Sequence, residues 1–168
     1  MTREIAVLIT VGIAVLVLLA MTFAWRRRVR RDADLSAPIG VPEHAEVASR
    51  HGVLYVATTR HDEPLERLAV SPLAFRARGE LTLTDRGVVL SLDGSPTVFL
   101  ASSKLIAADR ATVAIDRVVE PQGLIRLVWL VADTLAVDSY LRLTAGDPQN
   151  LIADLQRLCA APETGASS

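Results

Sequence analysis

This sequence lacks cysteine pairs, the motifs of known catalytic sites, and the positive charge that nucleic-acid-binding domains carry. Cys159 is the one cysteine, so neither an intramolecular disulfide nor a cluster of thiolate metal ligands can form within the chain. The chain has no G-x-S-x-G, no glycine-rich phosphate loop and no H-E-x-x-H motif. We therefore expect no enzyme activity, no catalytic residues and no cofactor.

Charge is missing altogether from the 21 residues Ile5–Trp25. As a helix rising ~1.5 Å per residue, this run reaches roughly 31 Å, the thickness of the hydrocarbon core of a bilayer. It is longer than the apolar part of a cleaved signal peptide, about 7–15 residues, and it ends in arginines rather than in a cleavage site. We predict an uncleaved transmembrane helix. It holds no ionisable residue, so by itself it is no transport pathway.

Five arginines follow the apolar run: Arg26, Arg27, Arg28, Arg30 and Arg31. Because Lys and Arg stay on the cytoplasmic side, they predict a single-pass protein of the cell membrane with residues 1–4 outside and the C-terminal domain in the cytoplasm. The arginines would contact the anionic inner leaflet, where each contributes about 1 kcal/mol of attraction. Setting the topology is the favoured role, and recruitment of a specific lipid is the alternative.

The remainder of the chain is acidic. Residues 32–168 contain 18 acidic and 12 basic side chains, a net charge of −6. A nucleic-acid-binding face needs positive charge to release counterions, so no nucleic-acid partner is expected. By composition, residues 26–50 are a basic collar and linker, residues 51–160 a domain, and residues 161–168 a disordered tail.

Short β-strands are predicted through most of the domain. The first is Val53–Thr59, rich in β-branched and aromatic residues, and a loop follows it over Arg60–Pro72. Alternating residues on both sides of a turn at Asp85–Gly87 predict a hairpin from Gly79 to Leu92. Further strands are expected at Ala74–Arg78, Thr97–Ala101, Leu105–Ile106 and Thr112–Val119.

The strongest β pattern is Leu124–Leu143. Apolar residues alternate onto one face of a first strand (Ile125, Leu127, Trp129, Val131) and of a second (Leu135, Val137, Leu141, Leu143, with Ser139 among them). The opposite face of the second strand carries Asp138, Tyr140 and Arg142, which we expect to meet water. An amphipathic helix follows, capped by Asp147 and beginning at Pro148, with Cys159 as a packed core thiol.

Few polar residues are candidates for a site. His44 and His51 lie in the predicted linker and are expected to be solvated rather than metal ligands. The following loop contains four further polar side chains that could act as metal ligands or acid–base groups: His61, Asp62, Glu63 and Glu66. These side chains are also expected to be solvated. Asp138 and Ser139 point to opposite faces of one strand, so they cannot form a catalytic site with the distant His61. No metal site is predicted.

The order of elements resembles the pleckstrin-homology-like (PH-like) fold. The resemblance is carried by ATVAIDRVVEPQGLIRLVWLVADTLAVDSYLRL followed by DPQNLIADL, and it covers about residues 50–160 with the anchor before them. This part is similar to the bacterial PH-like domain of small single-span actinobacterial membrane proteins. The resemblance implies an α+β, mainly β fold: an N-terminal transmembrane helix, then a barrel or sandwich of about seven antiparallel strands capped by a C-terminal α-helix.

The function expected from these features is a membrane-anchored, non-enzymatic interaction module on the cytoplasmic face. Its partner would be a protein, bound by loops or an exposed strand edge. The alternatives are a peripheral lipid-binding or lipid-sensing domain and an auxiliary subunit of a membrane transport complex. Phosphoinositide-binding PH domains present basic residues in their first inter-strand loop. Here Arg60–Arg67 holds three acids against two arginines, which disfavours headgroup binding there.

Overall fold

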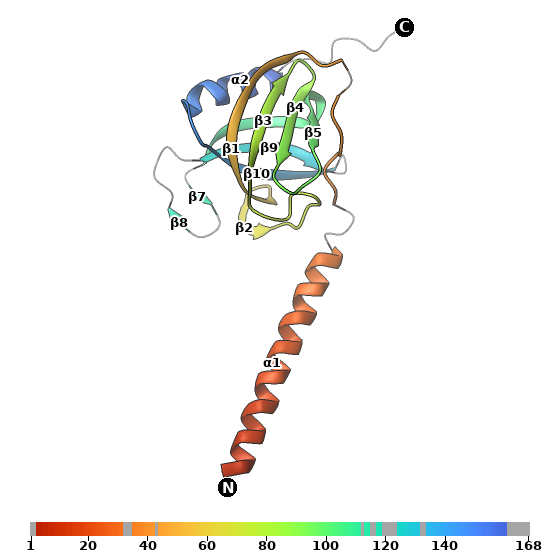
Figure 1. Cartoon of the computed structure of the whole chain (residues 1–168), viewed down its shortest axis with the longest axis vertical. Helices are drawn as coiled ribbons and strands as arrows, with labels where there is room; N and C mark the ends of the chain where they lie inside the picture. Colours follow the sequence, from red (N-terminus) through yellow and green to blue (C-terminus); the bar gives the residue numbers. More distant parts are fainter. Residues whose placement is uncertain are drawn as a thin grey trace. The chain divides into compact units, whose positions relative to one another are not determined.

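A computed structural model (Figure 1) describes residues 3–31, 35–42, 44–111, 113–114, 117–118, 124–131 and 134–160. The chain forms two units, residues 1–34 and residues 35–168, and each is described by itself.

The first unit is the helix α1 (Arg3–Arg31). Its segment Val7–Arg27 has a mean hydropathy of 2.7, none of it buried, so it is long and apolar enough to cross a membrane. The Thr22 hydroxyl donates to the carbonyl of Leu19 at 2.9 Å, which satisfies this polar group within the helix. The predicted helix is therefore present, with apolar side chains exposed all round it.

The second unit is built on one antiparallel sheet, whose members among the described residues run in the order β5-β4-β3-β1-β10-β9-β6, with β2 paired to β1. The strands are β1 (Val47–Arg60), β2 (Glu63–Arg67), β3 (Ala77–Thr84), β4 (Gly87–Leu92), β5 (Val98–Ala101), β6 (Leu105–Ala111), β9 (Leu124–Val131) and β10 (Leu135–Leu143). A one-turn helix η1 (Ser102–Lys104) follows β5, and β7 (Val113–Ala114) pairs with β8 (Arg117–Val118). The helix α2 (Pro148–Ala160) packs mainly against β6 (Figure 1).

The long strand β1 joins the two halves of the sheet. Its first part, residues 47–55, pairs with β3, and its second part, residues 53–60, pairs with β10. Register shifts interrupt both pairings, so the strand bends as it passes from one neighbour to the other. The sheet therefore curls around its main apolar core, as the PH-like resemblance implies.

The hairpin and the final helix are confirmed. β3 and β4 pair with Thr84 opposite Gly87, and Asp147 Oδ1 accepts the backbone N–H of Gln149 at 2.9 Å, which caps α2. β1 begins six residues before the predicted Val53, and the predicted loop Arg60–Pro72 contains β2. The predicted tail 161–168 lies outside the described residues.

Part of the stretch expected to be a linker pairs with the domain. The N–H of Ala37, a buried residue, donates to the carbonyl of Ser71 at 2.7 Å, and the N–H of Phe99 donates to the carbonyl of Pro38 at 3.0 Å. Ile39 forms an antiparallel bridge with Val98 of β5. Residues 38–40 therefore cover part of the outer edge of β5.

The predicted core face of β9 and β10 is confirmed. Ile125, Leu127, Trp129 and Val131 are each at most 1% exposed, and α2 adds Leu151, Ile152 and Leu155 to the same apolar cluster. Cys159 is half-buried and packs against this cluster, as predicted.

The prediction for the opposite face of β10 is wrong at two of three positions. Arg142 is exposed, but Asp138 is 1% and Tyr140 2% exposed. Tyr140 packs in a second apolar cluster with Ala111 and Leu124, while the turn after β1 places His61 on Asp138. Both faces of β10 are therefore covered at its centre.

Candidate functional site

A two-residue turn, His61–Asp62, carries the first part of the candidate site between β1 and β2. Arg60 pairs with Glu63 on either side of it, and the N–H of His61 donates to the carbonyl of Ala136 in β10 at 3.3 Å. Asp62 has a φ of 60°, in the left-handed region that Asp tolerates better than most residues. The turn thus brings two side chains over the outer face of β10.

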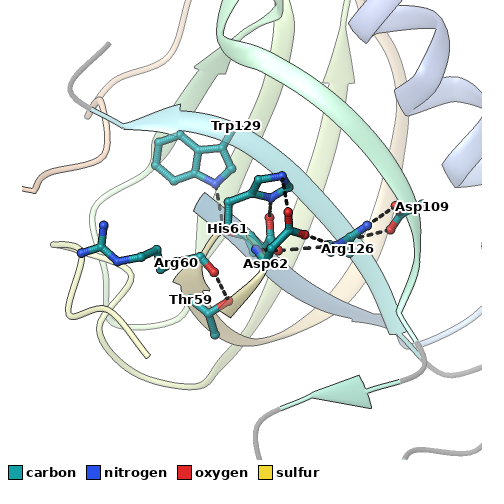
Figure 2. Close-up of polar contacts among 9 residues, drawn as sticks. Thr59, Arg60, His61, Asp62, Asp109, Arg126 and Trp129 are labelled. Carbon is teal, nitrogen blue, oxygen red and sulfur yellow. Dashed lines mark hydrogen bonds and ion pairs between the residues drawn. The ribbon is translucent and has the colours of Figure 1, made fainter. Parts of the chain in front are cut away.

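Asp138 is the buried centre of this cluster. Its Oδ1 lies 2.7 Å from Nδ1 of His61, and its Oδ2 accepts the N–H of Asp62 at 3.4 Å. A carboxylate on Nδ1 fixes the orientation of the imidazole and favours a proton on that nitrogen. Nε2 of His61 then faces Oδ2 of Asp62 at 3.4 Å (Figure 2).

Arg126 closes the cluster on its other side. From β9 it makes a bidentate pair with Asp109 of β6, with Nε–Oδ1 at 2.8 Å and Nη2–Oδ2 at 2.5 Å (Figure 2). The pKa of Arg126 is raised, chiefly by the hydrogen bond to Asp109, so this guanidinium stays charged. Its Nη1 also lies 3.6 Å from Asp138 Oδ2 and 3.7 Å from Asp62 Oδ1.

A pocket of about 310 Å³ adjoins these groups. Its lining includes Asp62, Arg110, Arg126, Asp138 and Tyr140. Burial raises the pKa of the Tyr140 hydroxyl, so that it stays protonated at neutral pH. The pocket therefore has polar walls of both signs.

The His61–Asp138 contact resembles half of a catalytic triad but has no nucleophile beside it in the part of the chain described. Ser139 lies on the opposite face of β10, where its Oγ is 2.9 Å from Trp129 Nε1 and 2.7 Å from Thr58 Oγ1. The separation of Asp138 from Ser139 is thus confirmed. The view of His61 as distant is wrong, because antiparallel pairing of β1 with β10 brings the turn to Asp138 across 77 sequence positions.

The donors of this cluster also suit a metal ion. His61, Asp62 and Asp138 each offer a ligand atom, all within 4.8 Å of one another. Imidazole nitrogen with carboxylate oxygen is a donor set that Zn²⁺ and similar divalent ions accept. The residue types were visible in the sequence, but the convergence of Asp138 with His61 was not.

A second hollow, the α2 groove, lies between the start of β1 and α2. It has a volume of about 460 Å³ and is lined by Glu46, Val47, Ala48, Ser49, Leu83, Thr84, Asp85, Asp154, Arg157 and Leu158. Val47 is 51% exposed although apolar. Three carboxylates lie around the apolar residues, and the one cation, Arg157, is paired with Asp154. The groove is therefore apolar with an acidic rim.

The other candidates from the sequence are not among the residues named for either feature. Arg26 and Arg27 are exposed on α1, while the side chains of Arg28, Arg30 and Arg31 lie outside the described part. His44 is exposed, and Nε2 of His51, in β1, lies 3.0 Å from the hydroxyl of Ser49.

The two loop glutamates are associated with each other rather than with His61. The pKa of Glu63 is raised, chiefly by a side-chain hydrogen bond with Glu66. Glu66 also lies 3.4 Å from Nε of Arg60.

The chain is similar to one protein family and to solved structures. A family model described as bacterial PH domain-like matches residues 35–156. The C-terminal phosphotyrosine interaction domain of APBB2 from mouse, a solution structure, aligns with a TM-score of 0.48 and 13% identity, over 75% of this chain and 95% of that domain. No curated protein matches the chain.

Proposed function

Because the chain belongs to the bacterial PH domain-like family, we propose that it is a membrane-anchored, non-enzymatic module that binds a protein on the cytoplasmic face. PH-like domains typically mediate protein or lipid interactions. The α2 groove is the observation that carries the choice of a protein ligand. Its occupant is a basic segment of a partner protein that also carries apolar side chains.

Charge and shape together select this occupant. The rim residues Glu46, Asp85 and Asp154 outnumber Arg157, which gives the groove a net charge of −2. A basic segment is attracted to such a rim, whereas anionic lipid headgroups are repelled. The apolar residues of the groove, Val47 and Leu83 among them, supply the surface that becomes desolvated on binding.

The edges of the sheet offer less to a partner. Residues 38–40 cover part of β5, through the bonds of Phe99 and Ile39 described above. On β6, the carbonyl of Ala108 accepts a hydrogen bond from Nε2 of Gln156 in α2 at 2.8 Å. Strand addition at either edge would have to displace these contacts, so the groove is the favoured surface.

The helix α1 anchors the domain to the cell membrane in this proposal, with the domain in the cytoplasm. The five arginines from Arg26 to Arg31 give the helix its direction. A reporter that matures only outside the cytoplasm, fused after Ser168, should stay inactive. An active fusion would contradict the cytoplasmic assignment, and neutralising the five arginines should weaken the orientation bias.

Photo-crosslinking from the groove tests the partner. We would place a photoreactive amino acid at Val47 in the full-length protein in its native membrane, and use exposed Leu65, in β2, as the matched control position. We expect a protein adduct from position 47, with a captured peptide that carries basic and apolar side chains. We expect no protein adduct from position 65. Asp85→Asn should reduce the yield of the adduct from position 47. Lipid adducts alone, or equal adducts from both positions, would reject the proposal.

A further inference from the structure

The contact between His61 and Asp62 leaves two electron-pair donors facing each other. Nδ1 of His61 lies 2.7 Å from Oδ1 of Asp138, and Nε2 on the other side of the ring faces Oδ2 of Asp62 at 3.4 Å. An imidazole nitrogen and a carboxylate oxygen are donor types that a divalent metal ion binds.

The spacing of the two donors fits a metal ion. Zn²⁺ binds imidazole nitrogen at about 2.0–2.1 Å and carboxylate oxygen at about 2.0–2.2 Å, and tetrahedral geometry then separates the two donors by about 3.4 Å. The observed separation between Nε2 and Oδ2 is 3.4 Å. His61 and Asp62 are 37% and 75% exposed at their side chains, so water has access to the remaining coordination positions.

The surroundings complete the support that a histidine ligand needs. Metal-bound histidines almost always donate their other N–H to a carboxylate or carbonyl, which fixes the ring and raises its basicity. Asp138 provides such a carboxylate at 2.7 Å and is 1% exposed, so its position is fixed by burial. The ligand and its supporting carboxylate are therefore both in place.

The net charge of the cluster also favours a cation. Asp62, Asp109 and Asp138 carry three negative charges, against the positive charges of Arg126 and of Arg110, which lines the same pocket, so the side chains other than His61 sum to −1. The guanidinium of Arg126 makes its bidentate bond to Asp109, and its Nη1 lies 3.7 Å from Oδ1 of Asp62, whereas Oδ2 of Asp62 is the oxygen that faces His61. The excess negative charge attracts a cation to this turn.

We propose that the β1–β2 turn binds one Zn²⁺-type divalent cation through Nε2 of His61 and the carboxylate of Asp62. Asp138 is the positioning residue for His61, and water completes the coordination. This site is separate from the α2 groove and does not depend on the proposed protein partner.

Calorimetric titration of the full-length protein with Zn²⁺, in nanodiscs of zwitterionic lipid, tests the site. We expect one ion per chain for the wild type. Asp62→Asn keeps a residue type that tolerates the left-handed backbone and removes the charged ligand, so it should weaken binding at least ~10-fold. Asp138→Asn should weaken it by about 10–100-fold, the range for loss of a supporting group. His51→Gln is the matched control and should bind as the wild type does.

Visible absorption of bound Co²⁺, used in place of Zn²⁺, gives a second readout. A purely structural role of His61 would not produce this signal. Four-coordinate Co²⁺ should give visible absorption bands in the wild type that His61→Gln removes, while the far-UV circular dichroism of both proteins stays the same. Failure of the wild type to bind Zn²⁺ would overturn the proposal. Equal affinity in Asp62→Asn and wild type, or loss of binding in His51→Gln, would overturn it as well.

Discussion

Replacing Ser139 with alanine should lower the unfolding free energy of the domain by about 2 kcal/mol, although only one oxygen atom is removed. The hydroxyl lies in a buried chain of hydrogen bonds across the core. Trp129 Nε1 donates to Ser139 Oγ at 2.9 Å, and Ser139 Oγ lies 2.7 Å from Thr58 Oγ1. Thr58 Oγ1 is in turn 2.8 Å from Tyr55 Oη, which donates to the carbonyl of Leu73 at 2.7 Å.

The groups at the two ends of this hydrogen-bond network fix the direction of every hydrogen bond in it. An indole N–H can only donate and a carbonyl can only accept, so Ser139 donates to Thr58 and Thr58 donates to Tyr55. Removal of the Ser139 hydroxyl leaves the indole N–H of Trp129, a residue 0% exposed, without an acceptor. An unsatisfied buried donor costs about 1–3 kcal/mol, and this is the main part of the predicted loss.

Urea unfolding of the full-length protein in nanodiscs, followed by far-UV circular dichroism, measures the effect. For a domain of this size the loss corresponds to a fall in Tm of roughly 8 °C. Ser91→Ala, in strand β4 of the same sheet and with an exposed side chain, is the matched control and should change the unfolding free energy by less than about 0.5 kcal/mol.

A double-mutant cycle with Trp129→Phe tests whether the unpaired indole N–H of Trp129 causes the loss of stability. The Phe ring has no N–H to lose its partner, so Ser139→Ala should cost at least about 1 kcal/mol less in that background. Additive effects, within about 0.5 kcal/mol, would refute the view that the orphaned indole N–H causes the loss.

Three further predictions concern other parts of the domain. Burial raises the pKa of Tyr55, so above about pH 10 the folded state keeps a proton that the unfolded state releases. The unfolding free energy should therefore fall as the pH rises above about 10. Urea titrations at about pH 9 to 11 measure this slope, and Tyr55→Phe should flatten it. Gly87→Ala should cost roughly 1–3 kcal/mol, because φ is 147° and a Cβ would lie 2.1 Å from the carbonyl oxygen of Leu100; an unchanged urea midpoint would contradict this. Burial also raises the pKa of the Cys159 thiol, so iodoacetamide at pH 8 should alkylate it more slowly than a small free thiol, with the difference abolished in urea. Equal rates without urea would show that the thiol is not packed against the core.

The local elements were predictable because their signals lie within a few neighbouring residues. The absence of charge in Ile5–Trp25 is sufficient to predict the helix α1. Alternation of period two identified the core face of β9, and Asp147 with Pro148 located the start of α2. Each of these depends on sequence spacings shorter than the element itself.

The candidate metal site was not predictable, because its members come from strands far apart in the sequence. Alternation placed Asp138 on the face opposite Ser139, as the structure does, but it carries no information on what covers that face. The turn residues His61 and Asp62 cover Asp138 through the pairing of β1 with β10, a contact set by the curl of the whole sheet.

Sequence alone thus determined the apolar helix, the hairpin, the final helix and the positions of most strands along the chain, because hydrophobic periodicity and helix capping are local properties. Tertiary structure alone decided that β1 spans two neighbours, that Asp138 is buried against His61, and that an acidic groove forms beside α2. The physical reason is that burial and electrostatic environment depend on contacts between distant segments, which no short-range pattern encodes.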